Sequence, residues 1–127
     1  MSVTLDKIIE QFADDFLICD VHNPIICNTV VNEEAALYNL SEESINECLT
    51  VYKNITGETL TLNTELSTLS GGQKVALMLL LALYSPAQKI VIIDFKFTLD
   101  AAKAEEFTRL IQSFRHKGKE IKLMDTI

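Results

Sequence analysis

The sequence predicts an α/β fold: a small, three-layer-like domain with a short, mostly parallel sheet and flanking helices. Residues 89–94 (KIVIID) form a continuous apolar run that ends in an acid, which is typical of a parallel strand covered on both faces. Shortly after it, residues 107, 110, 111 and 114 are apolar and recur at helical spacing. The second half of the chain thus alternates between helix and strand, an order that favours parallel units.

The other elements follow from apolar spacing and from helix caps. Ser41 is a good N-cap, because its hydroxyl accepts a free backbone N–H, and two glutamates follow it. Gly118 is expected to end the last helix. The segment 59–62 fits either a short strand or an extended loop. The expected helices are Ser2–Asp15, Thr29–Asn39, the helix after Ser41, the helix from LSGGQ to Tyr84, and the helix from Asp100 to Lys117; the expected strands are Phe16–Val21, Lys89–Asp94 and Ile121–Met124.

The composition argues against several classes of function. The chain has 127 residues, which suggests a single domain over 1–127, and 48% of them are hydrophobic. The net charge is −7 and the isoelectric point about 4.7, so nucleic-acid phosphates and anionic lipids repel the protein and we expect no direct nucleic-acid binding. The most apolar run, 75–84, has ten residues, whereas a membrane span needs roughly 20. We therefore expect no membrane insertion.

The three cysteines, Cys19, Cys27 and Cys48, form no CxxC pair, and none clusters with histidine at zinc-ligand spacing. An odd number of cysteines, in a sequence without a recognisable signal peptide, favours reduced and buried thiols in the cytoplasm. No metal site is expected.

Three motifs follow one another in the second half of the chain. Residues 69–73 are LSGGQ, residues 90–94 are IVIID about twenty positions later, and residues 98–100 are TLD. In this order and spacing they resemble the signature motif, the Walker B strand and the D-loop of ATP-binding-cassette (ABC) ATPases. A looser likeness upstream, at His22-Asn23-Pro24 and 29–34, extends the resemblance over 16–127. It implies part of a P-loop ATPase core plus its helical subdomain, while 1–15 is an N-terminal helix of unknown role.

The sequence lacks parts that ABC ATPases need for hydrolysis. It contains no GxxxxGKS/T loop, and none of its four glycines opens one. By the resemblance, Phe95 stands at the acid that orients water, His22 at the Q-loop glutamine and Thr126 at the switch histidine. We therefore expect a truncated and degenerate relative with no catalytic residue, no autonomous hydrolysis and no cofactor. Binding of ATP and Mg²⁺ is expected only together with a partner.

The signature motif has two interpretations. In the family it contacts the γ-phosphate of ATP held by the opposite subunit, and a helix N-terminus favours an anion. Alternatively, Ser70 is only the N-cap of a buried helix and the glycines form a tight turn. The candidates for phosphate contact in trans are Ser70, Gly71, Gly72 and Gln73.

Asp94 and Asp100 are the acids retained from the other two motifs. The resemblance implies that Asp94 holds magnesium through water. The alternative, favoured without a phosphate loop, is that Asp94 ends a strand and caps nearby backbone N–H groups. Asp100 matches the D-loop aspartate.

The resemblance also implies a strand order with 89–94 in the middle. The last strand, 121–124, would then present an apolar edge at the place of the missing phosphate-loop strand, and such edges promote association. The N-terminal helix, a second copy of the chain or a partner protein is expected to cover it. The chain is accordingly predicted to be a homodimer or a subunit.

Three hypotheses for function follow. The first, preferred, is a non-catalytic ABC-ATPase-like interaction or regulatory module. The second is a split ABC ATPase half that donates its signature motif in trans to ATP bound by a partner subunit. The third is an unrelated small α/β protein in which LSGGQ occurs by chance; it predicts no parallel strand of the Walker B type.

Overall fold

The computed structural model describes residues 4–24, 28–97 and 99–126. The chain divides into two compact units. One, here called the sheet unit, contains the residues up to Asn23 and those from Ala87 onward; the other, the helical unit, is Pro24–Pro86. The single domain expected from the chain length stays a prediction.

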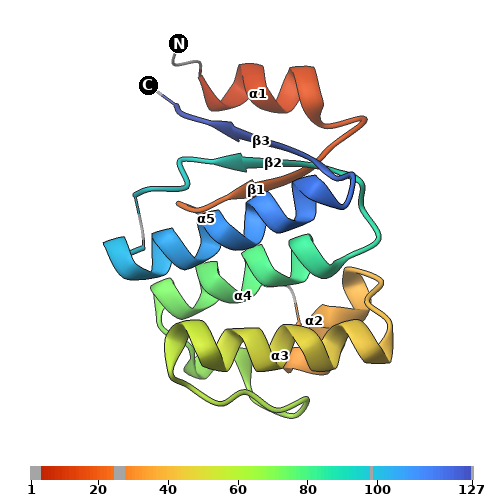
Figure 1. The fold of residues 1–127 in the computed structure, drawn as a ribbon, viewed down its shortest axis with the longest axis vertical. Helices are drawn as coiled ribbons and strands as arrows, with labels where there is room; N and C mark the ends of the chain where they lie inside the picture. Colours follow the sequence, from red (N-terminus) through yellow and green to blue (C-terminus); the bar gives the residue numbers. More distant parts are fainter. Residues whose placement is uncertain (1–3, 25–27, 98, 127) are drawn as a thin grey trace. The chain divides into compact units, whose positions relative to one another are not determined.

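The sheet unit contains a three-stranded sheet in the order β1-β2-β3, with both pairings parallel (Figure 1). The strands are β1 (Leu17–Asp20), β2 (Lys89–Ile93) and β3 (Glu120–Met124). The predicted fold class and the central position of β2 are therefore confirmed. A parallel strand of the Walker B type is present as β2, which argues against the hypothesis of an unrelated fold.

Helix α1 (Leu5–Phe12) covers one face of this sheet. Its buried Ile8 belongs to one cluster with Val91 and Ile93, whose side chains point to the same face of β2. The predicted bounds, Ser2–Asp15, were wrong. At the N-terminus, Thr4 is the N-cap, so the helix begins only at Leu5. At the C-terminus, the acids at positions 14 and 15 would be unfavourable, because this end of the helix dipole is negative. Positions 2 and 3 lie outside the described residues.

Helix α5 (Ala101–His116) connects β2 to β3 and matches its prediction closely. The Asp100 carboxylate accepts a hydrogen bond from the Lys103 N–H at 2.9 Å, as an N-cap should. Past the C-terminus, Gly118 has a φ of 103°, a left-handed conformation that glycine adopts easily. Figure 1 shows α1 and α5 flanking the strands.

The helical unit contains α2 (Val31–Leu37), α3 (Glu42–Thr56), a 3₁₀ turn η1 (Leu66–Thr68) and α4 (Gly71–Tyr84). Ser41 caps α3, as predicted, and Gly57 ends it with a φ of 78°. Helices α3 and α4 pack against each other. The segment 59–62, which fitted a strand or a loop, forms no strand.

Helix α2 starts two residues later than its predicted start at Thr29. Val30 pairs in an antiparallel bridge with Glu65, and the Thr29 carbonyl accepts a hydrogen bond from the Leu66 N–H at 2.9 Å. These backbone groups are thus held in an extended conformation. The helix also ends before Asn39, which has a φ of 61°, a conformation that asparagine tolerates better than most residues.

Helix α4 is buried at every position from 75 to 83. Burial on all sides agrees with the apolar run seen in the sequence. No helix in the described ranges combines the length and apolar character needed to cross a membrane.

Candidate functional site

Asp94 lies directly after β2 and is 2% exposed. Its φ of 55° is uncommon for a residue other than glycine and turns the chain sharply away from the strand direction. The predicted strand end at Asp94 was therefore one residue too long. A buried carboxylate requires hydrogen-bond partners, because an unpaired charge in the interior costs several kcal/mol on order of magnitude.

Three donors meet this carboxylate. The Thr126 N–H donates to Oδ1 at 2.7 Å, and the Thr126 hydroxyl donates to Oδ2. His22 Nε2 lies 2.9 Å from Oδ2. Since an ionised carboxylate only accepts, the histidine donates through Nε2. Both oxygens of Asp94 are thus engaged by groups of this chain.

These contacts control the protonation of Asp94. Burial acts to raise the pKa of the carboxyl group, but the hydrogen bonds from the Thr126 hydroxyl and N–H lower it, as do the hydrogen bond and charge of His22. The net result is a pKa below the ordinary value. The carboxylate therefore remains ionised in the folded state at neutral pH.

The Asp94 cluster, defined here as His22, Asp94 and Thr126, joins the carboxyl ends of the three strands. His22 is two residues past β1, Asp94 one past β2 and Thr126 two past β3. The motif comparison had assigned these three residues to the Q-loop, Walker B and switch positions one by one. Sequence reasoning missed their mutual contact, although the shared edge of parallel strands was a signal for it.

Two phenylalanines border the cluster in different ways. Phe95, at the position of the family's water-orienting acid, is 3% exposed and packs edge-on against Phe107, with ring centroids 6.5 Å apart. Phe97 is 68% exposed, and its ring centroid lies 5.6 Å from that of His22. Neither side chain can accept a proton, so the cluster offers no general base at position 95.

The signature residues belong to the first turn of α4, in the helical unit. The Ser70 hydroxyl accepts a hydrogen bond from the Gln73 N–H at 3.2 Å, and the Gln73 side-chain oxygen accepts one from the Ser70 N–H at 2.8 Å. This reciprocal pair is a capping box. The side chains of Ser70 and Gln73 are thereby both engaged in local structure, as the N-cap interpretation expects.

Gly71 and Gly72 are exposed, and an added Cβ at either position would meet no atom within 4 Å. Among the described residues, no hydrogen bond from either backbone N–H is recorded. The first turn of α4 therefore presents two N–H groups at the positive end of a helix that is 14 residues long.

The D-loop-like residues are only partly described. Asp100 caps α5, as stated above, and also lies 3.7 Å from the Lys103 ammonium. Thr98 is outside the described residues. The structure thus brings Asp94 together with His22 and Thr126, while Asp100 has its own local partner.

The cysteines offer no reactive thiol in the described ranges. Cys19 and Cys48 are buried and free, and burial raises the pKa of each thiol to about 12. A thiol of such high pKa is a poor nucleophile and metal ligand at neutral pH. Cys27 lies outside the described residues. No metal-binding cluster of three or more His, Cys, Asp or Glu occurs in residues 4–24, 28–97 and 99–126.

Comparison with known proteins identifies the fold. No protein-family model matches the chain, and no curated protein matches it. Solved structures do match. The ATP-binding subunit of an ABC transporter matches with a TM-score of 0.68 and 17% identity, over 97% of this chain and 53% of its own.

Two further structures agree with this result. A dimeric ATP-binding cassette in a post-hydrolysis state, bound to ADP and Pi, matches with a TM-score of 0.63 and 20% identity, over 98% of this chain and 57% of its own. The protein cbiO1 from Clostridium perfringens, part of the ABC transporter complex cbiONQ, gives a TM-score of 0.60 and 17% identity, over 94% and 50%. This chain therefore has the fold of parts of ABC-transporter ATP-binding subunits and spans about half of their length.

Proposed function

We propose that this chain is a non-catalytic, ABC-ATPase-like module that acts by binding another protein in an interaction or regulatory role. The observation that carries the proposal is the Asp94 cluster. Both oxygens of Asp94 accept hydrogen bonds from Thr126 and His22. In the family that the chain resembles, this acid helps to hold magnesium. Here donors from the chain itself take three of the roughly four acceptor sites of the carboxylate, so they compete with the metal's water.

The neighbouring substitutions support the same conclusion. Phe95 is buried against Phe107 where the family has its water-orienting acid. Each difference removes a separate part of the hydrolytic mechanism, which makes this role the simplest account of the chain. We place the protein in the cytoplasm under this proposal.

Calorimetric titration with Mg-ATP tests the proposal directly. We expect no heat of binding up to millimolar ATP. Saturable binding by the wild type that is lost in Ser70→Arg would overturn it, because the signature would then hold phosphate without a phosphate loop. Asp14→Asn, an exposed change in the other unit, serves as the control for non-specific effects of charge.

A second candidate function is a split ATPase half that donates its signature motif to ATP on a partner subunit. It is favoured by the exposed Gly71 and Gly72, whose surroundings leave room for a ligand to approach the backbone. The test adds this chain to a phosphate-loop protein that lacks its own signature and measures ATP hydrolysis. Stimulation that Ser70→Arg abolishes, with the fold unchanged by circular dichroism, would support it. Unchanged hydrolysis with every candidate partner would reject it.

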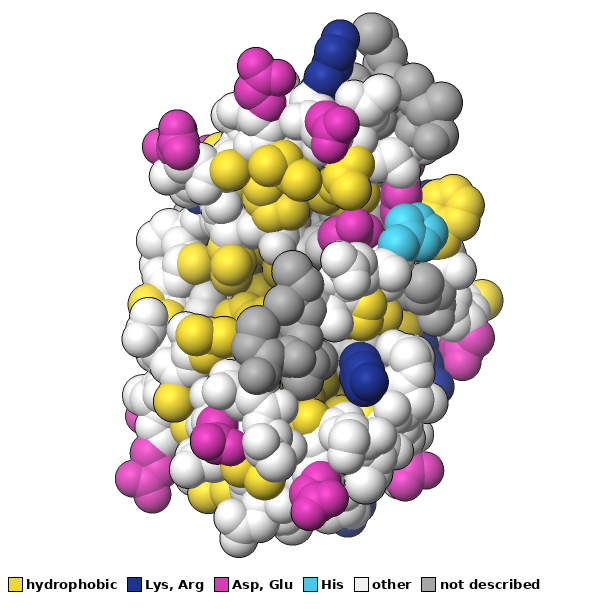
Figure 2. Space-filling model, turned by 180° about the vertical axis from the view of Figure 1, so that it is seen from behind, with side chains coloured by type: hydrophobic (Ala, Val, Ile, Leu, Met, Phe, Trp, Pro, Cys, Tyr) yellow, Lys and Arg dark blue, Asp and Glu magenta, His cyan; other side chains and the backbone are white. Residues whose placement is uncertain are grey.

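Exposed apolar surface supports an association partner in either case. Figure 2 shows hydrophobic side chains reaching the surface among acidic ones. Where such side chains form a contiguous patch, they mark an interaction site. The large hydrophobic residues that are exposed in the described ranges are Ile9, Leu37, Leu62, Phe97 and Leu123.

The outer edge of β3 is the part of the sheet that we assign to a homodimer contact or to a protein partner. Hydrogen bonds from Asp94 N–H to the Met124 carbonyl and from Glu120 N–H to the Gln88 carbonyl fix which backbone groups face β2. By the alternation of a parallel ladder, the groups of Ile121 and Leu123 face outward.

One backbone group at the outer edge of β3 already has a hydrogen-bond partner within the chain. The Arg115 guanidinium donates two hydrogen bonds to the outward Ile121 carbonyl, at 3.1 and 2.6 Å. Leu123 remains 40% exposed. Helix α1 packs on a face of the sheet, as described above, so a second copy or another protein is the better candidate to cover this edge.

A further inference from the structure

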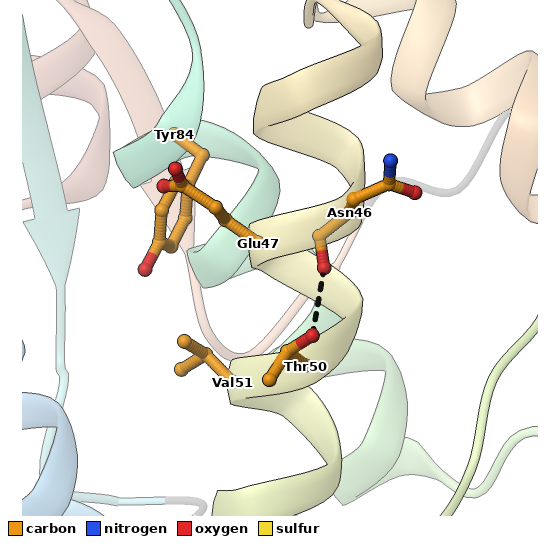
Figure 3. A pocket seen from close by; sticks show the side chains of 5 residues that line it. All are labelled: Asn46, Glu47, Thr50, Val51 and Tyr84. Carbon is orange, nitrogen blue, oxygen red and sulfur yellow. Dashed lines mark hydrogen bonds between the residues drawn. The ribbon is translucent and has the colours of Figure 1, made fainter.

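A pocket opens on the surface of the helical unit, between α3 and α4. Its volume is about 320 Å³. The side chains that line it are Asn46, Glu47, Thr50 and Val51 of α3 and Tyr84 of α4 (Figure 3). All of them belong to the helical unit, whereas the Asp94 cluster belongs to the sheet unit.

The pocket contains one charged side chain, Glu47, beside neutral polar side chains. The Thr50 hydroxyl donates to the Asn46 carbonyl at 3.0 Å, drawn as the dashed line in Figure 3, which leaves the lone pairs of its oxygen as acceptors. Glu47 contributes a carboxylate, and Asn46 contributes an amide that has both an acceptor oxygen and an NH2 donor. Val51 and the Tyr84 ring supply apolar surface beside these groups.

The negative charge of Glu47 is uncompensated in the described structure, where this carboxylate takes part in no recorded ion pair. One helical turn before it stands Glu43, another acid, and the positions three before, three after and four after it are Ser44, Thr50 and Val51. Like charges four residues apart destabilise a helix by a few tenths of a kcal/mol on order of magnitude.

The charge of Glu47 also acts on the aromatic wall of the pocket. Burial raises the pKa of the Tyr84 phenol, and the charges of Glu47 and Cys48 add to this rise. The carboxylate and the ring line the same pocket, so both can contact one ligand (Figure 3). A carboxylate beside an aromatic ring is the combination that binds organic cations.

We propose that this pocket binds an arginine side chain of a partner protein. A guanidinium can donate in a fork to Glu47 while its planar face stacks on Tyr84, whereas a lysine ammonium supplies only a point charge. The open pocket suits the end of a side chain that enters from another surface. The net charge of −7 favours a basic partner by long-range attraction.

This inference rests on the proposed role as an interaction module and adds the chemistry of one contact. Its test uses a peptide and no nucleotide, so a failure here leaves the Mg-ATP result untouched. The probe is acetyl-Gly-Arg-Gly-amide, titrated into isotope-labelled protein and followed by NMR. The matched probe has citrulline in place of arginine, which has almost the same shape but no charge.

We expect shifts confined to the pocket residues, saturating at millimolar peptide, and at least fivefold weaker binding of the citrulline peptide. Glu47→Gln should weaken arginine-peptide binding at least fivefold. Glu105→Gln, an exposed change on α5, should leave it unchanged. Tyr84→Phe, which keeps the ring, should retain binding and shows that the packing of the unit survives.

Three outcomes would overturn the proposal. If the citrulline peptide bound as tightly as the arginine peptide, the positive charge would not be needed for binding. If a folded Glu47→Gln protein bound the arginine peptide as tightly as the wild type, the Glu47 carboxylate would not contribute to binding. Tenfold tighter binding of free arginine amide than of the peptide would identify a small amine, in place of a partner protein, as the occupant.

Discussion

Asp94, directly after β2, accepts two hydrogen bonds from Thr126, beyond the end of β3: one from the backbone N–H at 2.7 Å and one from the hydroxyl. In sequence the two residues are 32 positions apart. The contact joins the central strand to its neighbour at their carboxyl ends. We infer that this acid, which the family resemblance associates with magnesium, serves here to hold the sheet together.

Replacing Asp94 by asparagine should destabilise the protein by about 2 kcal/mol, since hydrogen bonds to buried charged groups contribute about 1.5–3 kcal/mol each. The new amide also turns an N–H group toward the Thr126 and His22 donors. Urea unfolding followed by circular dichroism measures the loss. Asp14→Asn, on the exposed segment after α1, is the control. A change below about 0.5 kcal/mol for Asp94→Asn would contradict the structural role, because surface substitutions fall in that range.

The stability should fall in acid in a way that depends on Asp94. Its folded-state pKa lies below the ordinary value of about 3.9, so its contribution is fully present above that value and is lost as the pH falls through the folded-state pKa. Unfolding free energies measured from pH 7 down to pH 3 should therefore decline more steeply for the wild type than for Asp94→Asn. Parallel curves for the two proteins would show that this carboxylate does not cause the decline.

Local signals in the sequence predicted much of the fold. The caps at Ser41 and Asp100 depend only on a side chain and the next few backbone N–H groups, and both are confirmed. For Ser70, the N-cap was one of two interpretations, and the structure contains that cap. The central position of β2 was implied by the family resemblance and is confirmed by the strand order. The capping box at Ser70 also explains Gln73 without any ligand.

Features that depend on distant partners escaped prediction. Thr29 and Val30 were predicted to be helical, but their backbone pairs with Glu65 and Leu66. Because these partners are far away in the sequence, the local pattern could not predict the pairing. The hydrogen bonds to Asp94 come from residues that follow β1 and β3, so they form only when the three strands are assembled. At the carboxyl ends of the strands, the sequence identified His22, Asp94 and Thr126 one by one. It did not predict that they contact one another.

Ser70→Ala should destabilise the protein by about 1 kcal/mol, the usual cost of losing an N-cap side chain. It removes the side-chain oxygen that accepts a hydrogen bond from the Gln73 N–H. Of the capping box, only the hydrogen bond from the Ser70 N–H to the Gln73 side chain remains. Chemical denaturation quantifies the effect, and Ser70→Asp, which restores a capping oxygen, should recover most of the loss. An unrecovered loss would show that Ser70 has a role other than capping.

Gly72→Ala should stabilise the protein by up to about 1 kcal/mol, because alanine loses less conformational entropy in a helix and its Cβ would meet no atom within 4 Å. If the signature acts in trans, the same substitution should weaken stimulation of a partner ATPase, since the methyl group obstructs close approach of phosphate. Measuring thermal unfolding and hydrolysis on one sample separates the two effects. A destabilised variant would contradict the open surroundings of Gly72.

The edge of β3 gives the last prediction. Arg115→Ala removes the two hydrogen bonds to the Ile121 carbonyl and frees an outward backbone acceptor beside the exposed Leu123. Uncovered strand edges pair with one another, so sedimentation velocity should show stronger self-association for this variant than for the wild type. Leu123→Lys, which places a charge on the same edge, should weaken association. If all three proteins remain monomeric over the whole concentration range, the edge is not a site of self-association, and the partner must be a different protein.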